Sequence, residues 1–187
     1  MNVALRVPAM TREAFFDWAE ARDEPYEFDG FQPVAMTGGT INHNQMIGNL
    51  GEALRTRLRG GPCRALIEAG IATVGDAVRY PDALVTCAKL DGTARLVPGA
   101  VIVFEVLSPT SGRTDRIDKL REYRAVPSIR RYIILEHTSA ALQVLSRDQA
   151  DTDWTATALT AEDTLDLPEV GITIPVTDLY ESVDLPT

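Results

Sequence analysis

The stretch that decides the fold covers residues 101–123 and reads VIVFEVLSPTSGRTDRIDKLREY. Its first seven residues form a continuous β-branched and aromatic run, which is typical of a strand buried on both faces of a sheet. One carboxylate, Glu105, lies inside this run. A lone buried charge is costly unless a cation, a metal ion or a hydrogen-bond network compensates it. Glu105 is therefore the first candidate for a functional residue.

A charged helix is predicted directly after this strand. Ser108 and Pro109 end the strand, Thr114 is a suitable N-cap, and Lys119 follows in the first turns of the helix. A strand that ends near a carboxylate and leads into a charged helix is a common frame for a catalytic corner. The alternative, a structural Glu105 paired with a nearby arginine, stays open.

The overall composition indicates one ordinary globular domain, which we expect to cover residues 1–187. With 45% hydrophobic and 24% charged residues, the chain has no apolar run long enough to span a membrane, and its N-terminus lacks the pattern of a signal peptide. The two cysteines, Cys63 and Cys87, lack metal-ligand spacing. We therefore expect both thiols to be reduced and the protein to be cytoplasmic.

The charge of the chain is unevenly distributed. The net charge of −9 argues against a nucleic-acid partner. Residues 148–187 contain ten acidic and no basic residues, however, so residues 1–147 carry about +1. Residues 113–131 contain seven basic and three acidic residues. This local excess allows a phosphate-facing patch, although a solvated helix face is the default explanation for such charges.

The rest of the chain predicts elements on both sides of the central stretch. Apolar residues at helical spacing indicate helices at 11–21 and 40–59 and a last helical turn at 176–180. Asp29-Gly30 is a strong turn signal and predicts a β-hairpin. Strands are expected at 26–28, 31–36, 64–69, 70–74, 80–87, 131–135, 141–145, 154–159 and 172–174. No repeat or linker divides the domain.

Asp82 repeats the pattern of Glu105, because it enters an apolar strand directly after Pro81. Neighbouring strands lie about 5 Å apart, so the two carboxylates can share a divalent cation. Hard oxygen ligands with open water positions suit Mg²⁺ or Mn²⁺, which activates water and neutralises charge on a phosphodiester. Lys119 is the cation expected near the scissile phosphate. The alternative is that Lys119 only forms a surface ion pair with Asp115, which would stabilise the helix by about 0.3–0.5 kcal/mol.

Further candidates surround this set. Asp115, Lys119 and Tyr123 recur every four residues and form one stripe of the predicted helix. Glu27 alternates with two aromatic residues in the first hairpin, and His43 lies in the first turn of the helix at 40–59. An exposed strand residue and a helix-capping residue are the default explanations for Glu27 and His43.

In order and spacing, these motifs resemble the Uma2 family of endonuclease-like proteins, which have the PD-(D/E)XK nuclease fold and are abundant in bacteria, especially cyanobacteria. The resemblance extends over roughly residues 26–145. It rests on Tyr-Glu-Phe-Asp-Gly at 26–30, the helix start around His43, Arg-Tyr-Pro-Asp at 79–82, Phe-Glu-Val-Leu-Ser-Pro-Thr-Ser at 104–111 and Asp-Arg-Ile-Asp-Lys-Leu-Arg-Glu-Tyr at 115–123.

The resemblance implies an α/β fold: a PD-(D/E)XK-like central mixed sheet flanked by helices, with accessory antiparallel hairpins. It also implies Asp82 and Glu105 as ligands of Mg²⁺ or Mn²⁺, with Glu27 joining them from the hairpin. The superfamily pattern places a lysine two residues after the glutamate, where this chain has Leu107. In Uma2-like sequences the lysine is moved to the helix, which maps onto Lys119.

We therefore expect a metal-dependent endonuclease that hydrolyses DNA phosphodiester bonds. A homodimer is also expected, because two symmetric sites cut both strands of a duplex and the resemblance points the same way. Two alternatives stay open. A non-catalytic binding or assembly module of the same fold is favoured by the acidic net charge and by the lack of an appended DNA-reading domain. A hydrolase of a small phosphoester would suit an acidic surface better than DNA would.

Overall fold

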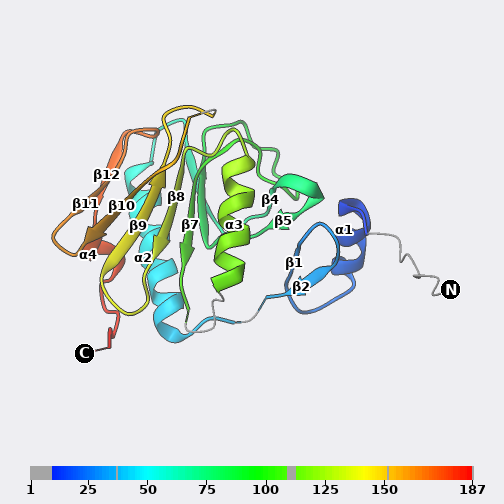
Figure 1. The fold of residues 1–187 in the computed structure, drawn as a ribbon, viewed down its shortest axis with the longest axis horizontal. Coiled ribbons are helices and arrows are strands. Elements are labelled where there is room, and N and C mark those ends of the chain that lie inside the picture. The colour runs from blue at the N-terminus through cyan, green and yellow to red at the C-terminus, as the bar shows by residue number, and fades with distance from the viewer. Residues whose placement is uncertain (1–9, 37, 109–112, 151, 187) are drawn as a thin grey trace.

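The computed structural model describes residues 10–36, 38–108, 113–150 and 152–186. Its centre is a six-stranded sheet in the order β10-β9-β8-β7-β6-β3 (Figure 1). These strands are β3 (Arg64–Ile67), β6 (Ala83–Thr86), β7 (Ala100–Val106), β8 (Arg131–Leu135), β9 (Ala141–Ser146) and β10 (Thr155–Thr160). The β7–β8 pair is parallel and the other pairs are antiparallel, so the sheet is mixed. The mixed sheet implied by the resemblance is therefore confirmed.

The two faces of this sheet carry separate hydrophobic cores because successive residues of β7 point to opposite faces. Ile102 and Phe104 lie in one core with Leu50, whereas Val103 lies in the other with Tyr123. Helices cover both faces, and α2 and α3 lie on opposite sides of the sheet (Figure 1). The helices are α1 (Arg12–Glu20), α2 (Ile41–Arg57), α3 (Arg113–Ala125) and α4 (Val176–Leu179). α3 connects the parallel strands β7 and β8, so it crosses over the sheet and returns beside β7.

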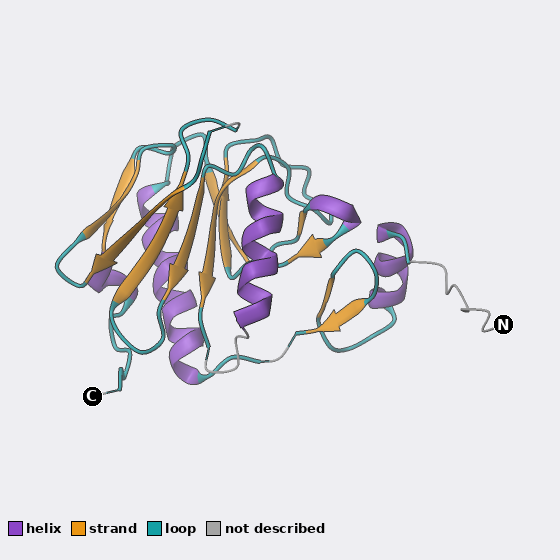
Figure 2. Cartoon of the chain, in the orientation of Figure 1, coloured by secondary structure: helices purple, strands orange, loops and turns teal. Residues whose placement is uncertain are grey.

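A smaller four-stranded sheet lies beside the central one, in the order β2-β1-β5-β4. Its strands are β1 (Tyr26–Phe28), β2 (Pro33–Ala35), β4 (Ile71–Ala72) and β5 (Val78–Arg79). α1 packs on it through Phe15, whose ring stacks on Phe28 at 5.1 Å over the buried Val78. Figure 2 shows α1 and the β1–β2 hairpin together at the side of the molecule, away from the central sheet.

A C-terminal hairpin and a short helix complete the core on the α2 face. The hairpin consists of β11 (Thr164–Leu167) and β12 (Ile172–Pro175), which pair antiparallel. Buried side chains of the hairpin and of α4, such as Leu165, Ile174 and Leu179, lie in the same core as α2. An ion pair between Arg57 and Asp178 at 2.6 Å joins α2 to α4.

The predicted helices, the first hairpin and the 131–145 hairpin are confirmed, whereas three details are wrong. The strand predicted at 80–87 begins only at Ala83, because the Asp82 side chain binds the neighbouring strand and ends the ladder. α3 begins at Arg113, so Thr114 lies inside the helix and not at its N-cap. β5 and β11 were not expected, because strands of two and four residues are too short for their patterns to stand out in the sequence, although Thr-Leu-Asp-Leu does alternate exposed and buried residues.

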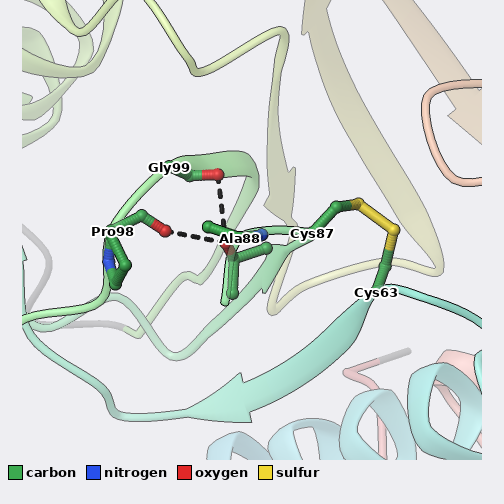
Figure 3. Close-up of a disulfide and its surroundings, with 6 residues drawn as sticks. Cys63, Cys87, Ala88, Pro98 and Gly99 are labelled. Atoms are coloured by element: carbon green, nitrogen blue, oxygen red, sulfur yellow. Dashed lines mark hydrogen bonds between the residues drawn. A yellow bond between two sulfur atoms is a disulfide. The ribbon is translucent and has the colours of Figure 1, made fainter. Parts of the chain in front are cut away.

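The expectation of two reduced thiols is also wrong, because Cys63 and Cys87 form a disulfide (Figure 3). They flank the Arg64–Thr86 pair of β3 and β6, so the antiparallel register brings them opposite one another. The cysteine-based argument for a cytoplasmic location therefore does not hold. Beside the disulfide, the Thr86 hydroxyl lies 2.7 Å from the Pro98 carbonyl and 3.1 Å from that of Gly99. None of the described helices is long and apolar enough to cross a membrane.

Candidate active site

Two carboxylates meet at the end of the β6–β7 pair. Ala83 lies opposite Phe104 in the antiparallel register, and continuing that register by one residue places Asp82 opposite Glu105. Directly opposed residues point to the same face of a sheet, with Cβ atoms about 5 Å apart. The charge of Asp82 accordingly contributes to a raised pKa of Glu105. The register thus brings together the two acids that the sequence singles out.

Asp82 is fixed by the backbone of β7. Its Oδ2 accepts a hydrogen bond from the Val106 N–H at 2.6 Å. Burial raises the pKa of Asp82 to about 6, although the Val106 N–H and the charge of Lys119 act in the opposite direction. A nearby cation stabilises the ionised form of such a buried carboxyl group, because it offsets the cost of burying the negative charge.

Glu105 is almost fully buried and receives two partners from α3. Its Oε1 accepts a hydrogen bond from the Tyr123 hydroxyl at 2.7 Å, and its Oε2 lies 3.2 Å from Lys119 Nζ. Burial raises the pKa of Glu105 to about 7; Lys119 opposes this rise and Asp82 adds to it. Burial and the charge of Glu105 also raise the pKa of Tyr123, so its phenol stays protonated and acts as the donor.

Lys119 lies between carboxylates that come from the two different sheets. Its Nζ is 3.2 Å from Glu105 Oε2 and 3.6 Å from Glu27 Oε1. Glu27 is 6% exposed and accepts hydrogen bonds from the Tyr80 N–H and from Arg79 Nη1, both at 3.1 Å. Glu27 therefore reaches the site from the first hairpin, and each of its oxygens has an N–H or cationic partner.

A buried ion-pair network that the sequence analysis did not identify lies next to Lys119. Arg79 donates from Nε and Nη2 to the two oxygens of Glu122 at 2.8 and 2.6 Å, and the Thr73 hydroxyl donates to the same carboxylate at 2.8 Å. Burial alone would lower the pKa of Arg79, but the hydrogen bonds and charges of Glu122 and Glu27 raise it. The only sequence signal is an arginine among apolar neighbours at 78–80; its partner lies 43 residues away.

His43 also joins the site from the first turn of α2. Its Nε2 lies 3.6 Å from Asp82 Oδ1, and burial lowers its pKa despite a hydrogen bond to the Val106 backbone. Gly39 leaves room for the imidazole, since a Cβ at that position would collide with His43 Nδ1. The Asp115 side chain, the remaining candidate, lies outside the described part of the structure.

The site offers hard oxygen donors of the kind that Mg²⁺ and Mn²⁺ bind. Mg²⁺ is commonly held by one or two carboxylates together with water and substrate phosphates. Asp82 and Glu105 therefore fit such an ion in chemical type. Within the described ranges, however, no group of three or more His, Cys, Asp or Glu side chains is gathered closely enough to hold a metal ion.

Comparison with known proteins relates nearly the whole chain to nuclease-like proteins. A sequence model of Uma2, described as "Putative restriction endonuclease", matches residues 12–177. Two Synechocystis proteins, "Uncharacterized protein slr1290" and "Uncharacterized protein sll1609", are 28% and 21% identical over 94% and 87% of this chain, and each match covers 94% of the relative.

The structural comparison supports the fold. A crystal structure of "a putative nuclease belonging to DUF820" from Anabaena variabilis matches with a TM-score of 0.72 at 12% identity, covering 91% of this chain and 97% of that one. The nuclease-like mixed α/β architecture is thereby confirmed.

Proposed function

This chain belongs to the Uma2 family, and we propose on that basis that it is a metal-dependent endonuclease that hydrolyses DNA phosphodiester bonds. The observation that carries the proposal is the convergence of Asp82, directly before β6, with Glu105 on β7 and Lys119 on α3. Lys119 Nζ lies 3.2 Å from Glu105, and both acids have raised pKa values in a buried setting. Perturbed pKa values of neighbouring buried groups are typical of functional sites.

Asp82 and Glu105 hold the Mg²⁺ or Mn²⁺ ion in this proposal. When bound, such an ion activates water and neutralises charge on the phosphodiester. The Val106 N–H and the Tyr123 hydroxyl each hold one oxygen of these carboxylates, which fixes the orientation of both ligands before the substrate arrives.

Lys119 supplies the positive charge that stabilises the phosphate in the transition state. A preorganised cation in a site shielded from water is effective there, because it needs no reorientation when negative charge develops. Glu27 positions this ammonium from the opposite side, at 3.6 Å, and is itself held by Arg79. We assign this positioning role to Glu27 because its two oxygens lie beside the two cations Lys119 and Arg79.

The proposal extends to the assembly. Cleavage of both strands of a duplex is simplest with two symmetric sites, and closed two-fold association is the commonest oligomer. We therefore propose that the protein acts on DNA as a homodimer of one restriction-endonuclease-like domain.

The experiment is nicking of supercoiled plasmid in Mg²⁺, Mn²⁺ or EDTA. The wild type should nick only with metal, and Asp82→Asn and Glu105→Gln should lower the rate by at least about 100-fold. Glu162→Gln, which neutralises an exposed acid in the turn after β10, should behave like the wild type. The proposal fails if no metal supports cleavage of supercoiled, linear or single-stranded DNA. Hydrolysis of bis-p-nitrophenyl phosphate alone would indicate a small-phosphoester hydrolase.

A further inference from the structure

A cavity of about 330 Å³ opens next to the candidate active site. Its wall includes the start of the β1–β2 hairpin, at Pro25 and Tyr26, and Met36 at the end of this hairpin. Glu68 and Tyr80 close it from the segments that precede β4 and β6. Its volume lies at the lower end of the range of about 300–1,000 Å³ that small-molecule sites occupy. The cavity therefore suits one ring system better than a complete nucleotide.

Backbone hydrogen bonds link the wall of this cavity to Glu27 and Asp82 of the candidate site. The N–H of Tyr80, a wall residue, donates to Glu27 Oε1 at 3.1 Å. The N–H of Glu68, another wall residue, donates to the Asp82 carbonyl at 3.2 Å, and the charge of Glu68 contributes to the raised pKa of Asp82. The cavity is thus bordered by residues that are hydrogen-bonded to Glu27 and to Asp82.

The residues that line the cavity determine which chemical group it can bind. Tyr26, Tyr80, Pro25 and Met36 provide flat or apolar surface, and the carboxylates of Glu24 and the neighbouring Glu68 provide hydrogen-bond acceptors. The lining includes no lysine, arginine or histidine among the described residues. A phosphate would meet like charge here, whereas a planar ring with N–H donors would find stacking surface and acceptors.

We propose that this cavity binds a nucleobase of the substrate and prefers bases that carry an exocyclic amino group. This inference rests on the proposed function only in taking the substrate to be nucleic acid. Enzymes that extract a base from the helical stack read it by stacking and by hydrogen bonds to its edge. A glutamate accepts from the amino group of cytosine, and thymine has no such group.

Trp18 provides a reporter for the test. Its ring lies 4.8 Å from that of Tyr26 in an edge-to-face arrangement. Trp154 is the second of the two tryptophans in the chain, so Trp154→Phe leaves Trp18 as the single tryptophan, whose emission is excited separately from that of the tyrosines. Deoxycytidine and thymidine are titrated into this variant in EDTA. We expect saturable fluorescence quenching by deoxycytidine, with a Kd lower than that of thymidine by at least about tenfold.

Matched variants locate the binding. Glu24→Gln and Glu68→Gln should each weaken deoxycytidine binding and reduce the preference over thymidine. Glu20→Gln should change neither, because this α1 carboxylate pairs with Arg95 at 2.7 Å and is not part of the cavity wall. Saturation-transfer NMR with the same nucleosides checks for binding that leaves the fluorescence unchanged.

The inference is overturned if neither method detects nucleoside binding, or if binding shows no base preference and ignores Glu24→Gln and Glu68→Gln. These outcomes are independent of cleavage. A protein that binds deoxycytidine in this way but never nicks DNA would overturn the nuclease proposal alone. A protein that nicks DNA but fails the nucleoside test would overturn the cavity proposal alone.

Discussion

Glu105→Gln should stabilise the metal-free protein at pH 8 and leave its stability nearly unchanged at pH 5. Burial and the nearby Asp82 raise the pKa of Glu105 from 4.5 to about 7, so the folded protein binds this proton more tightly than the unfolded chain does. Stability then falls as the pH rises above about 4.5, and the loss is complete above about 7. Glutamine keeps the shape of the side chain but cannot ionise, so the variant escapes this loss.

The magnitude follows from the size of the pKa change. Each pKa unit that separates the folded from the unfolded protein is worth about 1.4 kcal/mol, so a rise from 4.5 to about 7 corresponds to about 3 kcal/mol. The amide places an N–H near Lys119 Nζ, where the wild type has an attractive contact at 3.2 Å. We therefore expect a net gain of about 1–3 kcal/mol at pH 8 and less than about 1 kcal/mol at pH 5.

Urea unfolding at both pH values, in EDTA and in Mn²⁺, measures the effect. Mn²⁺ should stabilise the wild type, by about 2.7 kcal/mol at 100 times Kd, and should have little effect on Glu105→Gln. The matched control is Glu122→Gln, which neutralises a second buried glutamate, on α3 instead of β7. It should destabilise the protein, because Glu122 pairs with Arg79 and not with a second acid. A Glu105→Gln variant that is less stable than the wild type at pH 8, with an unchanged Mn²⁺ effect, would refute the reasoning.

Three further predictions concern the lysine, the buried network and the assembly. Lys119→Ala should lower the nicking rate by about 100-fold with little change in Mn²⁺ affinity, and Lys119→Arg should restore only part of it; wild-type rates for the alanine variant would remove Lys119 from the site. Arg79→Met should cost about 3–5 kcal/mol in urea unfolding, because it leaves Glu122 buried without its cation and removes one of the two cations beside Glu27. Arg95→Met, at an exposed pair with Glu20 of similar length (2.7 Å), should destabilise the protein far less, and equal costs would contradict the role of burial. Light scattering at tens of micromolar should give the mass of a dimer, and a monomer would count against two-fold cleavage.

The sequence predicts those parts of the fold and site in which neighbouring residues carry the signal. β7 is recognisable because its apolar run is long enough to mark burial on both faces, and α2 because its apolar residues keep helical spacing. The pairing of Asp82 with Glu105 was also within reach. Asp82 stands directly before its strand and Glu105 near the end of its own, and an antiparallel register places the start of one strand opposite the end of the other.

The remaining features depend on which distant segments of the chain pair in the fold, and local sequence patterns do not predict that pairing. The Cys63–Cys87 bond follows from the register of β3 with β6, which spacing along the chain does not reveal. Arg79 stands on a two-residue strand that is stable only within the small sheet, and its partner Glu122 lies on a helix of the central unit. The direction of the Glu27 side chain likewise depends on the position of the first hairpin beside α3, where Glu27 meets Lys119.

The position of Lys119 on a helix explains why buried polar contacts accumulate around α3. A lysine two residues after Glu105 would be held in place by the strand itself, but this chain has Leu107 there, so the helix must be fixed against the sheet instead. Tyr123 binds Glu105 at 2.7 Å, and Glu122 binds Arg79.

A third contact fixes the far end of α3. Arg147 donates to the Arg124 carbonyl at 3.0 Å and to the Val126 carbonyl at 2.6 Å, at the C-terminal end of the helix, where carbonyl groups lack helical partners and a positive charge is favourable. The helix is thus attached to β7, β5 and the residue after β9. Such contacts orient Lys119 more strictly than apolar packing alone, because each hydrogen bond constrains direction as well as distance. In the proposed function, the placement of Lys119 depends on α3, and this helix cannot rotate or slide without breaking these buried hydrogen bonds.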